Sequence, residues 1–415
     1  MATLDTRAGV DEHEGNFDLM VSKTVSRSTL ILLAIVAGVS VANNYYIQPL
    51  LYVLATSFHQ STKTIGILVT LSQFGYVVGL ITIVPLGDRI SRRFLLGTGL
   101  LLSVAFCLLQ SQTRSFPIFA ASVLFTGVTS TVAQTSVAFS AAISDPDKRA
   151  SSVSVVIAGL LTGILLARTA AGLIAQLFGY RAVFLSAAIA SAALVIIIFA
   201  LIPGEGTKAK IPYLSLLSSV LTFFVSSPLL RRRALFGGIT FACFSIFWTT
   251  LAPYLSAPPF HLNLISIGLI GFAGLAGVFA ARLAGFAADR GFGHIVTPVG
   301  WLILIGSFSA LVIGRRNILV IVVFAAILDL GIQGIHITNQ SIIYRLDPLS
   351  QSRVTTAYMT SYFTGGVLGS AGATLAFARF GIVGSYLFGV LITVFGLLVW
   401  ALGRSREKLM IQELN

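Results

Sequence analysis

Long apolar stretches separated by short polar connections run along almost the whole chain. A helix needs roughly 20 mostly apolar residues to cross a bilayer, and suitable stretches before residue 203 lie at 30–54, 64–86, 94–109, 116–143, 152–178 and 182–202. As many follow, at 234–255, 266–288, 295–313, 318–343, 355–380 and 383–402. The pattern predicts an all-α membrane protein with twelve transmembrane helices.

The longest polar connection, 203–233, divides these predicted helices into two groups of six. It contains Pro212 and Pro228 and ends on the basic run Arg231 to Arg233. We therefore expect an N-terminal tail at 1–28, a six-helix bundle at 29–202, a central loop at 203–233, a second six-helix bundle at 234–403 and a C-terminal tail at 404–415. Residues 1–21 lack an apolar centre, so no cleavable signal peptide is expected.

The composition agrees with a protein that has the bilayer as its solvent. Hydrophobic residues make up 56% of the chain and charged residues 10%, whereas soluble domains carry roughly 25% charged residues. A net charge of +13 would suit a nucleic acid partner, but Lys and Arg occupy the short connections, where they orient helices during insertion. With both termini cytoplasmic, the outer loops hold few of the 27 Lys and Arg residues: Lys63, Arg114, Arg181, Arg315, Arg316 and Arg379. We predict an N-in, C-in topology and no nucleic acid partner.

Residues for cofactor, metal or catalytic chemistry are scarce. Cys107 and Cys243 lie far apart in apolar runs, without a second ligand at metal spacing. No Gly-x-x-x-x-Gly-Lys-Ser/Thr loop and no His-Glu-x-x-His run occurs. We expect neither an enzyme nor an ATP-driven pump, and no cofactor or metal.

An internal repeat links the two groups of helices. The turn Gly87-Asp88-Arg89-Ile90-Ser91-Arg92-Arg93 follows the second stretch, and Asp289-Arg290-Gly291-Phe292-Gly293-His294 follows the eighth. Asp145-Pro146 precedes the fifth stretch, as Asp347-Pro348 precedes the eleventh. Two halves of common origin, with a substrate site between them, are a known transporter design.

At these residues the chain resembles the major facilitator superfamily, and more closely its bacterial branch of drug and metabolite exporters. The family loop reads Gly-x-x-x-Asp-Arg-x-Gly-Arg-Lys/Arg. Its first copy matches at Asp88, Arg89, Arg92 and Arg93 but has Val84 and Ser91 for the glycines, and its second copy keeps Gly285, Asp289, Arg290 and Gly291. The segments Asn43 to Leu50 and Gly163 to Thr169 also resemble this branch.

The resemblance implies a monomeric secondary transporter of the bacterial inner membrane that exports a small amphipathic solute in exchange for protons. The antiporter signature of the fifth helix survives only as Gly159 and Gly163, with Ile164 replacing its proline. Val123 stands where many proton-coupled members carry an arginine. A proton-coupled uptake system or a sugar or metabolite permease on the same fold therefore stays open. From another class, a transport-incompetent receptor or a membrane enzyme also stays open.

Repeated charged loops are the candidates for a cytoplasmic gate. Asp88 at a helix end can pair with loop arginines and with the positive N-terminus of a neighbouring helix. The other interpretation is that the arginines only orient the helices. The gate residues under the first interpretation are Asp88, Arg89, Arg92, Arg93, Asp289 and Arg290.

Ionisable residues inside predicted spans are functional hypotheses because they are costly in lipid. Arg168 is the deepest cation, and Asp329 is the one carboxylate inside any predicted span. We expect them to pair across the halves and to couple solute movement to proton movement, with a purely structural contact as the alternative. His336 can exchange protons near neutral pH, or it can be a hydrogen-bonded packing residue.

Polar and aromatic residues in the middle of other spans are the candidates for a substrate cavity. Asp329, Gln333, His336 and Gln340 fall on one face of the tenth helix. Amides and phenols among aromatic rings suit an amphipathic organic solute, because rings supply area and polar groups fix orientation. The predicted cavity residues are Asn43, Asn44, Gln48, Gln73, Tyr76, Gln134, Phe247, Trp248, Gln333, Gln340, Tyr358 and Tyr362.

Overall fold

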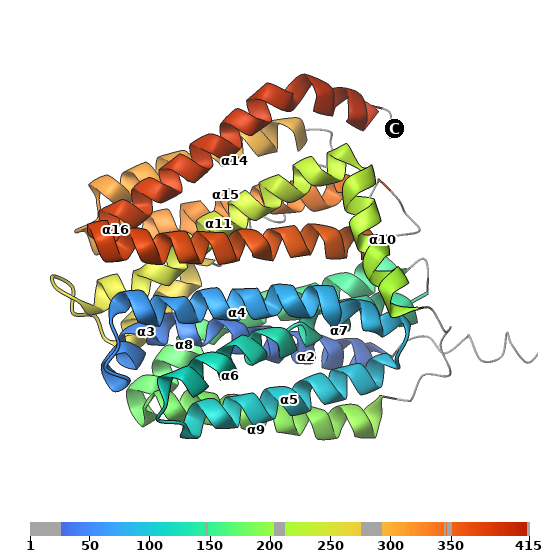
Figure 1. Cartoon of the computed structure of the whole chain (residues 1–415), viewed down its shortest axis with the longest axis horizontal. Helices are drawn as coiled ribbons and strands as arrows, with labels where there is room; N and C mark the ends of the chain where they lie inside the picture. Colours follow the sequence, from blue (N-terminus) through green and yellow to red (C-terminus); the bar gives the residue numbers. More distant parts are fainter. Residues whose placement is uncertain are drawn as a thin grey trace, which may run out of the picture.

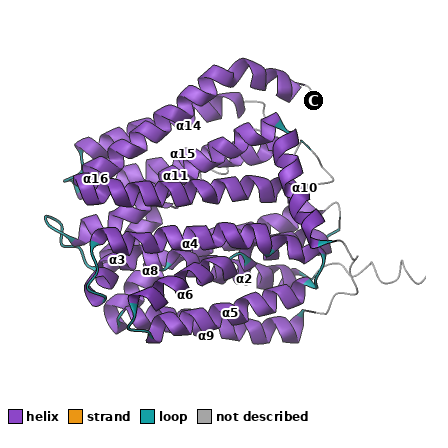
Figure 2. Cartoon of the chain, viewed as in Figure 1, coloured by secondary structure: helices purple, strands orange, loops and turns teal. Residues whose placement is uncertain are grey.

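Helices form nearly all of the part of the chain that the structure describes. This computed structural model describes residues 26–145, 148–202, 212–274, 293–343, 346 and 351–412. Within those ranges the chain folds into helices, turns and loops without a strand (Figure 2). The all-α prediction is confirmed for these residues.

The N-terminal half follows the predicted spans, with two of them each divided into two helices. The first span consists of α2 (Arg27–Tyr45) and α3 (Ile47–Ser57), and the fourth consists of α6 (Phe116–Thr129) and α7 (Val132–Ile143). The other elements are α4 (Thr62–Thr82), the 3₁₀ turn η1 (Val84–Asp88), α5 (Arg92–Gln112), α8 (Arg149–Phe178) and α9 (Tyr180–Leu201).

The C-terminal half differs from the prediction at its two ends. Its elements are α10 (Tyr213–Ser226), α11 (Pro228–Ser256), α12 (Leu264–Leu269), η3 (Ile270–Gly274), α14 (Gly293–Ile313), α15 (Ile318–Ile343) and α16 (Gln351–Gln412). The predicted central loop thus contains α10, whose apolar residues 214–225 favour a helix, and the basic run already belongs to α11. At the other end, α16 runs ten residues beyond the predicted last span.

Ten helices in the described part are long and apolar enough to cross a membrane. One of them, Val354–Ser405, contains two predicted spans joined at Gly381, where φ is 63° and the helical geometry is interrupted. Leu264–Gly274 begins the predicted span 266–288, whose remainder lies outside the described residues. The count of twelve and the N-in, C-in topology therefore stay predictions.

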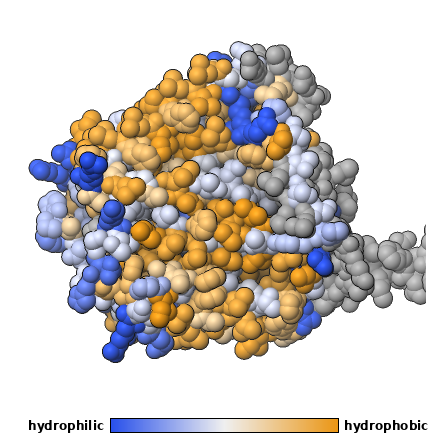
Figure 3. Space-filling model, viewed as in Figure 1, coloured by the Kyte–Doolittle hydropathy of each residue, from blue (hydrophilic) through white to orange (hydrophobic). Residues whose placement is uncertain are grey.

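The helices form two bundles that lie against each other. In Figure 1 the blue and green helices α2 to α9 occupy one side, and α11 to α16, in yellow-green to red, occupy the other. Apolar side chains cover the middle of the visible face, while polar side chains gather toward its two ends (Figure 3). Large side chains such as Ile313 and Leu402 are 83% and 88% exposed. A bilayer would cover such a surface.

The same close helix contact occurs once in each half. In α2, Gly38 lies so near α8 that a Cβ added to it would be 2.8 Å from the carbonyl oxygen of Gly159. A Cβ on Gly163 would be 2.2 Å from the oxygen of Gly38. These values leave no room for a methyl group, so the backbones touch. Small residues permit this approach between membrane helices.

The C-terminal half repeats this contact between α11 and α16. A Cβ on Gly365 would lie 1.9 Å from the oxygen of Gly238, and one on Gly369 would lie 2.5 Å from the oxygen of Ala242. Ala34, Gly38 and Ala42 recur 200 residues later as Ala234, Gly238 and Ala242. The three-dimensional repeat supports the two-half organisation inferred from the charged loops.

A buried ion cluster fastens the end of α16 to the start of α11. Glu407 is 4% exposed and accepts a hydrogen bond from Nε of Arg232 at 2.7 Å. It also forms an ion pair with Arg233, which is 3% exposed. Nη1 of Arg233 donates to Oδ1 of Asn339 on α15 at 3.1 Å and to Oγ1 of Thr297 on α14 at 3.3 Å. The segment expected to be a tail therefore completes the C-terminal bundle.

Candidate functional site

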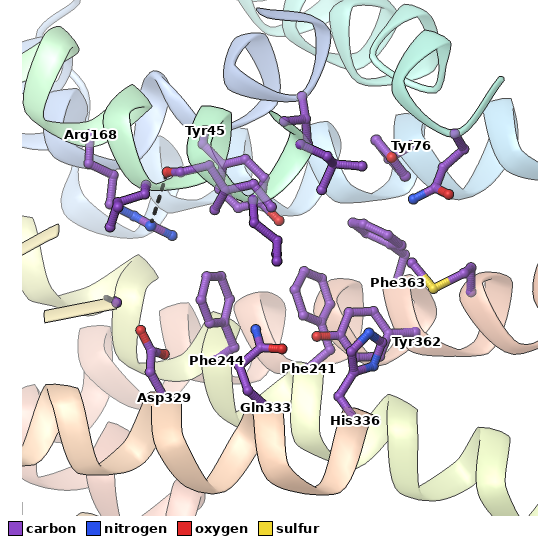
Figure 4. A pocket seen from close by; sticks show the side chains of 18 residues that line it. Tyr45, Tyr76, Arg168, Phe241, Phe244, Asp329, Gln333, His336, Tyr362 and Phe363 are labelled. Atoms are coloured by element: carbon purple, nitrogen blue, oxygen red, sulfur yellow. Dashed lines mark hydrogen bonds between the residues drawn. The ribbon is translucent and has the colours of Figure 1, made fainter. Parts of the chain in front are cut away.

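A cavity opens between the two halves near the middle of the helices. Its volume is about 840 Å³, including the space at its open side. The N-terminal half contributes α2, α4, α7 and α8 to its wall, and the C-terminal half contributes α11, η3, α15 and α16. Figure 4 shows the charged and aromatic side chains of both halves facing each other across this space.

Arg168 of α8 lies at one end of the cavity and is held by an amide and by aromatic rings. It is 3% exposed, and its Nε donates to Oε1 of Gln48 at 2.9 Å. Its Cζ lies 3.9 Å from the ring centre of Trp248, 5.1 Å from that of Phe244 and 5.2 Å from that of Tyr45. Cation–π contacts of this kind stabilise a charge that has lost its water. Within the part of the chain that the structure describes, Nη2 of Arg168 has no hydrogen-bond partner.

Asp329 of α15 faces Arg168 from the C-terminal half (Figure 4). It is 6% exposed and lies in the electrostatic field of the Arg168 guanidinium. No direct ion pair joins the two among the described residues, so their charged atoms are more than 4.0 Å apart. The two residues face one cavity from opposite halves, but they do not form the ion pair that the sequence predicted.

His336 lies two helical turns along α15 from Asp329 and lines the same cavity. Its Nδ1 is 2.9 Å from the hydroxyl oxygen of Tyr358, and its ring packs 4.4 Å from that of Tyr362. The Tyr358 hydroxyl also accepts a hydrogen bond from Nδ2 of Asn339 at 3.5 Å. Because Asn339 contacts Arg233, polar contacts run from His336 to the buried ion cluster.

The structure brings some of the predicted cavity residues together and places others elsewhere. Tyr76, Gln134, Gln333 and Tyr362 line the cavity beside Arg168, Asp329 and His336, whereas Gln340 does not. Gln48 and Trp248 lie behind Arg168, around a smaller space. The remaining ones are buried within their own halves: Asn43 bonded to Ser103, Asn44 to Ser72, Gln73 beside Tyr45, Phe247 stacked on Tyr386, and Tyr358 bonded to His336.

Aromatic residues that were not predicted form much of the wall. Tyr45, Phe241, Phe244 and Phe363 line the cavity. The rings of Phe241 and Phe244 stack at 5.3 Å. The spacing of Phe241, Phe244 and Trp248 at i, i+3 and i+7 is the sequence signal that would have placed them on one helix face.

The predicted gate is described only in part. Asp289 and Arg290 lie outside the described residues, and so does the side chain of Asp88 at the end of η1. Arg89 is exposed, and Arg92 begins α5. Arg93 donates to the backbone oxygen of Phe199 and lies 5.5 Å from its ring centre. Whether the loop acts as a gate stays a prediction.

Comparison with known proteins places this cavity in a transporter family. The sequence pattern of the Major Facilitator Superfamily matches residues 33–370. The chain is 42% identical to the uncharacterized transporter YgaY of Escherichia coli O157:H7 over 384 residues, which are 92% of this chain and 98% of that protein. It is 30% identical to the probable transporter SCO4007 of Streptomyces coelicolor, over 87% of this chain and 84% of the other.

Solved structures show the same fold at low sequence identity. A bacterial homolog of the human lysosomal transporter Spinster, in an inward-facing and unoccupied conformation, aligns with a TM-score of 0.69 and 14% identity. The alignment covers 94% of this chain and 98% of that one. The inward-facing, occupied form of such a homolog gives a TM-score of 0.71 at 13% identity over 93% of this chain and 96% of that one.

Proposed function

Because the chain belongs to the major facilitator superfamily, we propose that it exports a small amphipathic organic solute across the bacterial inner membrane in exchange for protons. Transport proceeds by alternating access of the central cavity to the two sides. The observation that carries the proposal is the position of Arg168 and Asp329, which face one cavity from opposite halves. A charge change at this place acts on both halves at once.

The separated charges give a physical route for coupling. In a site with little water, opposite charges attract strongly over several ångströms, so Asp329 and Arg168 draw the halves together. Protonation of Asp329 removes that attraction. His336 lies along the same wall and can take part in proton exchange. The aromatic rings between these groups offer the apolar surface that an amphipathic solute needs.

The contacts between the halves support an inward-facing state in the N-in, C-in topology. Oγ1 of Thr70 lies 3.0 Å from Oγ of Ser370, and Thr169 donates to the oxygen of Gly268 at 2.9 Å. Oε1 of Gln176 accepts from the backbone N–H of Leu264 at 3.2 Å. These bonds lie toward the predicted outer ends of the helices. The charged loop at Asp88 lies at the other, inner end of the helices. An inner gate would close there when the cavity turns to the outside.

Proton flux from proteoliposomes tests this proposal. The purified protein is reconstituted, a pH gradient is imposed, and solutes are added from a panel of amphipathic drugs, sugars and amino-acid derivatives. Proton movement opposite to the solute supports export by antiport. Movement in the same direction assigns the protein to proton-coupled uptake instead, and solute flux without proton movement contradicts the coupling role of the charged pair.

A further inference from the structure

Arg168 has hydrogen-bonding capacity left over, and Asp329 faces it across the cavity. Among the described residues, Nη2 of the buried Arg168 has no hydrogen-bond partner, although a guanidinium carries five N–H donors. The Asp329 carboxylate lies beside the indole of Trp248 and forms no ion pair with any described residue. Buried charged groups without partners are costly. The site can therefore bind a molecule that offers a hydrogen-bond acceptor to Arg168 and a hydrogen-bond donor to Asp329.

The backbone of η3 packs against both residues. A Cβ on Gly271 would lie 3.2 Å from Cβ of Arg168, and one on Gly274 would lie 3.2 Å from Oδ2 of Asp329. The two glycines are three residues apart in a 3₁₀ turn, which rises about 2 Å per residue. Arg168 and Asp329 thus lie against points about 6 Å apart along that turn.

We propose that the substrate is a small amphipathic zwitterion of the amino-acid type. This inference rests on the proposed transport function and assigns its substrate class. The carboxylate of the substrate accepts hydrogen bonds from Arg168, and its ammonium group donates to Asp329. Charge-assisted hydrogen bonds of both kinds are stronger than neutral ones. The apolar body of the substrate lies on the rings of Phe241, Phe244 and Tyr362.

Complementary charge explains why a zwitterion is preferred to a singly charged solute. A lone cation satisfies Asp329 but meets the positive field of Arg168, and a lone anion has the opposite problem. The zwitterion satisfies both groups and brings no net charge into a site with little water. Protonation of Asp329 removes the partner of the ammonium group, which links release of this substrate to proton uptake.

Binding of matched probes tests the proposal. L-Phenylalanine, phenethylamine and phenylpropanoate share an aromatic body but carry both charges, the positive charge or the negative charge. Leucine and tryptophan, with the corresponding amines and acids, provide two further sets. Affinity is measured by thermal stabilisation of the purified protein and by solute-triggered proton flux in proteoliposomes. We expect at least one zwitterion to bind about tenfold more tightly than its amine and its acid, since each lost charged hydrogen bond reduces affinity by that order.

Two variants and a control test which residue recognises each charged group of the substrate. Arg168→Gln should remove the preference for the zwitterion over the amine, and Asp329→Asn should remove the preference over the acid. Arg181→Gln, which removes an exposed charge next to Tyr180, should leave both preferences unchanged.

Equal binding of amine and zwitterion overturns the zwitterion assignment, as does failure of all three zwitterions to bind. The proposed function survives either result if other solutes still trigger proton flux. It fails separately if none of the solutes in the wider panel triggers proton flux.

Discussion

Substitution of Gly163 by alanine tests whether close backbone contact between α2 and α8 holds the N-terminal half together. The added Cβ would lie 2.2 Å from the carbonyl oxygen of Gly38, whereas ordinary contact begins at 3.4 Å. The helices must therefore separate by about 1.2 Å. Overpacking of this kind costs about 1–3 kcal/mol, and the neighbouring groups are backbone atoms that cannot rotate away. We expect Gly163→Ala to lower the thermal unfolding midpoint and to reduce transport.

The control is Gly306→Ala on α14, where an added Cβ would meet nothing within 4 Å. Alanine is better than glycine within a helix by roughly 0.5–1 kcal/mol, so this variant should be as stable as the original protein or slightly more so. The two variants make the same chemical change with opposite expected signs.

Gly369→Ala extends the test to the C-terminal half. Its added Cβ would lie 2.5 Å from the oxygen of Ala242, and it should behave as Gly163→Ala does. Thermal unfolding of the purified proteins in one detergent measures all three variants. Equal midpoints for Gly163→Ala and Gly306→Ala would refute the contact argument.

Three further predictions concern charged residues. Asp88→Asn should abolish transport in proteoliposomes while membrane insertion and yield stay normal; wild-type flux would remove the gate hypothesis. Asp329→Asn should make solute movement independent of pH, because the variant loses the titrating group. An unchanged pH profile would show that another residue couples solute movement to protons. Arg233→Met should lower the free energy of unfolding by about 1–3 kcal/mol, because the buried Glu407 loses one of its two arginine partners and keeps Arg232. The double variant with Glu407→Leu should recover much of that loss, and failure to recover in thermal unfolding would show that charge pairing is not the cause.

Much of the fold could be predicted because lipid imposes simple rules on sequence. Each membrane helix must satisfy its own backbone and remain apolar over its length, which sets the boundaries of the spans. The repeat could be recognised from two charged loops, and the glycine contacts of Gly38 and Gly238 show its three-dimensional form. The α10 helix was missed because its apolar run is shorter than a span and lies between polar segments.

The candidate site could be predicted only where a residue is exceptional. Arg168 and Asp329 attracted attention because charges inside spans are rare, and the structure places both on one cavity. The direction in which an ordinary polar residue points depends on helix rotation, which a single apolar helix does not reveal. Asn43 illustrates this, since it bonds to Ser103 within its own half. Gln340, eleven residues beyond Asp329, does not reach the cavity.

The ion cluster at Glu407 has a consequence for how the protein is made. Arg233 begins the C-terminal half, but its carboxylate partner is synthesised 174 residues later, almost at the end of the chain. During synthesis of the C-terminal helices the arginine can reach the neutral groups of Thr297 and Asn339 but lacks the carboxylate of Glu407. The ion cluster can form only after Glu407 has been synthesised. A nascent chain that ends before Glu407 would therefore carry the Arg233 cation without this carboxylate, a defect that quality-control proteases could recognise.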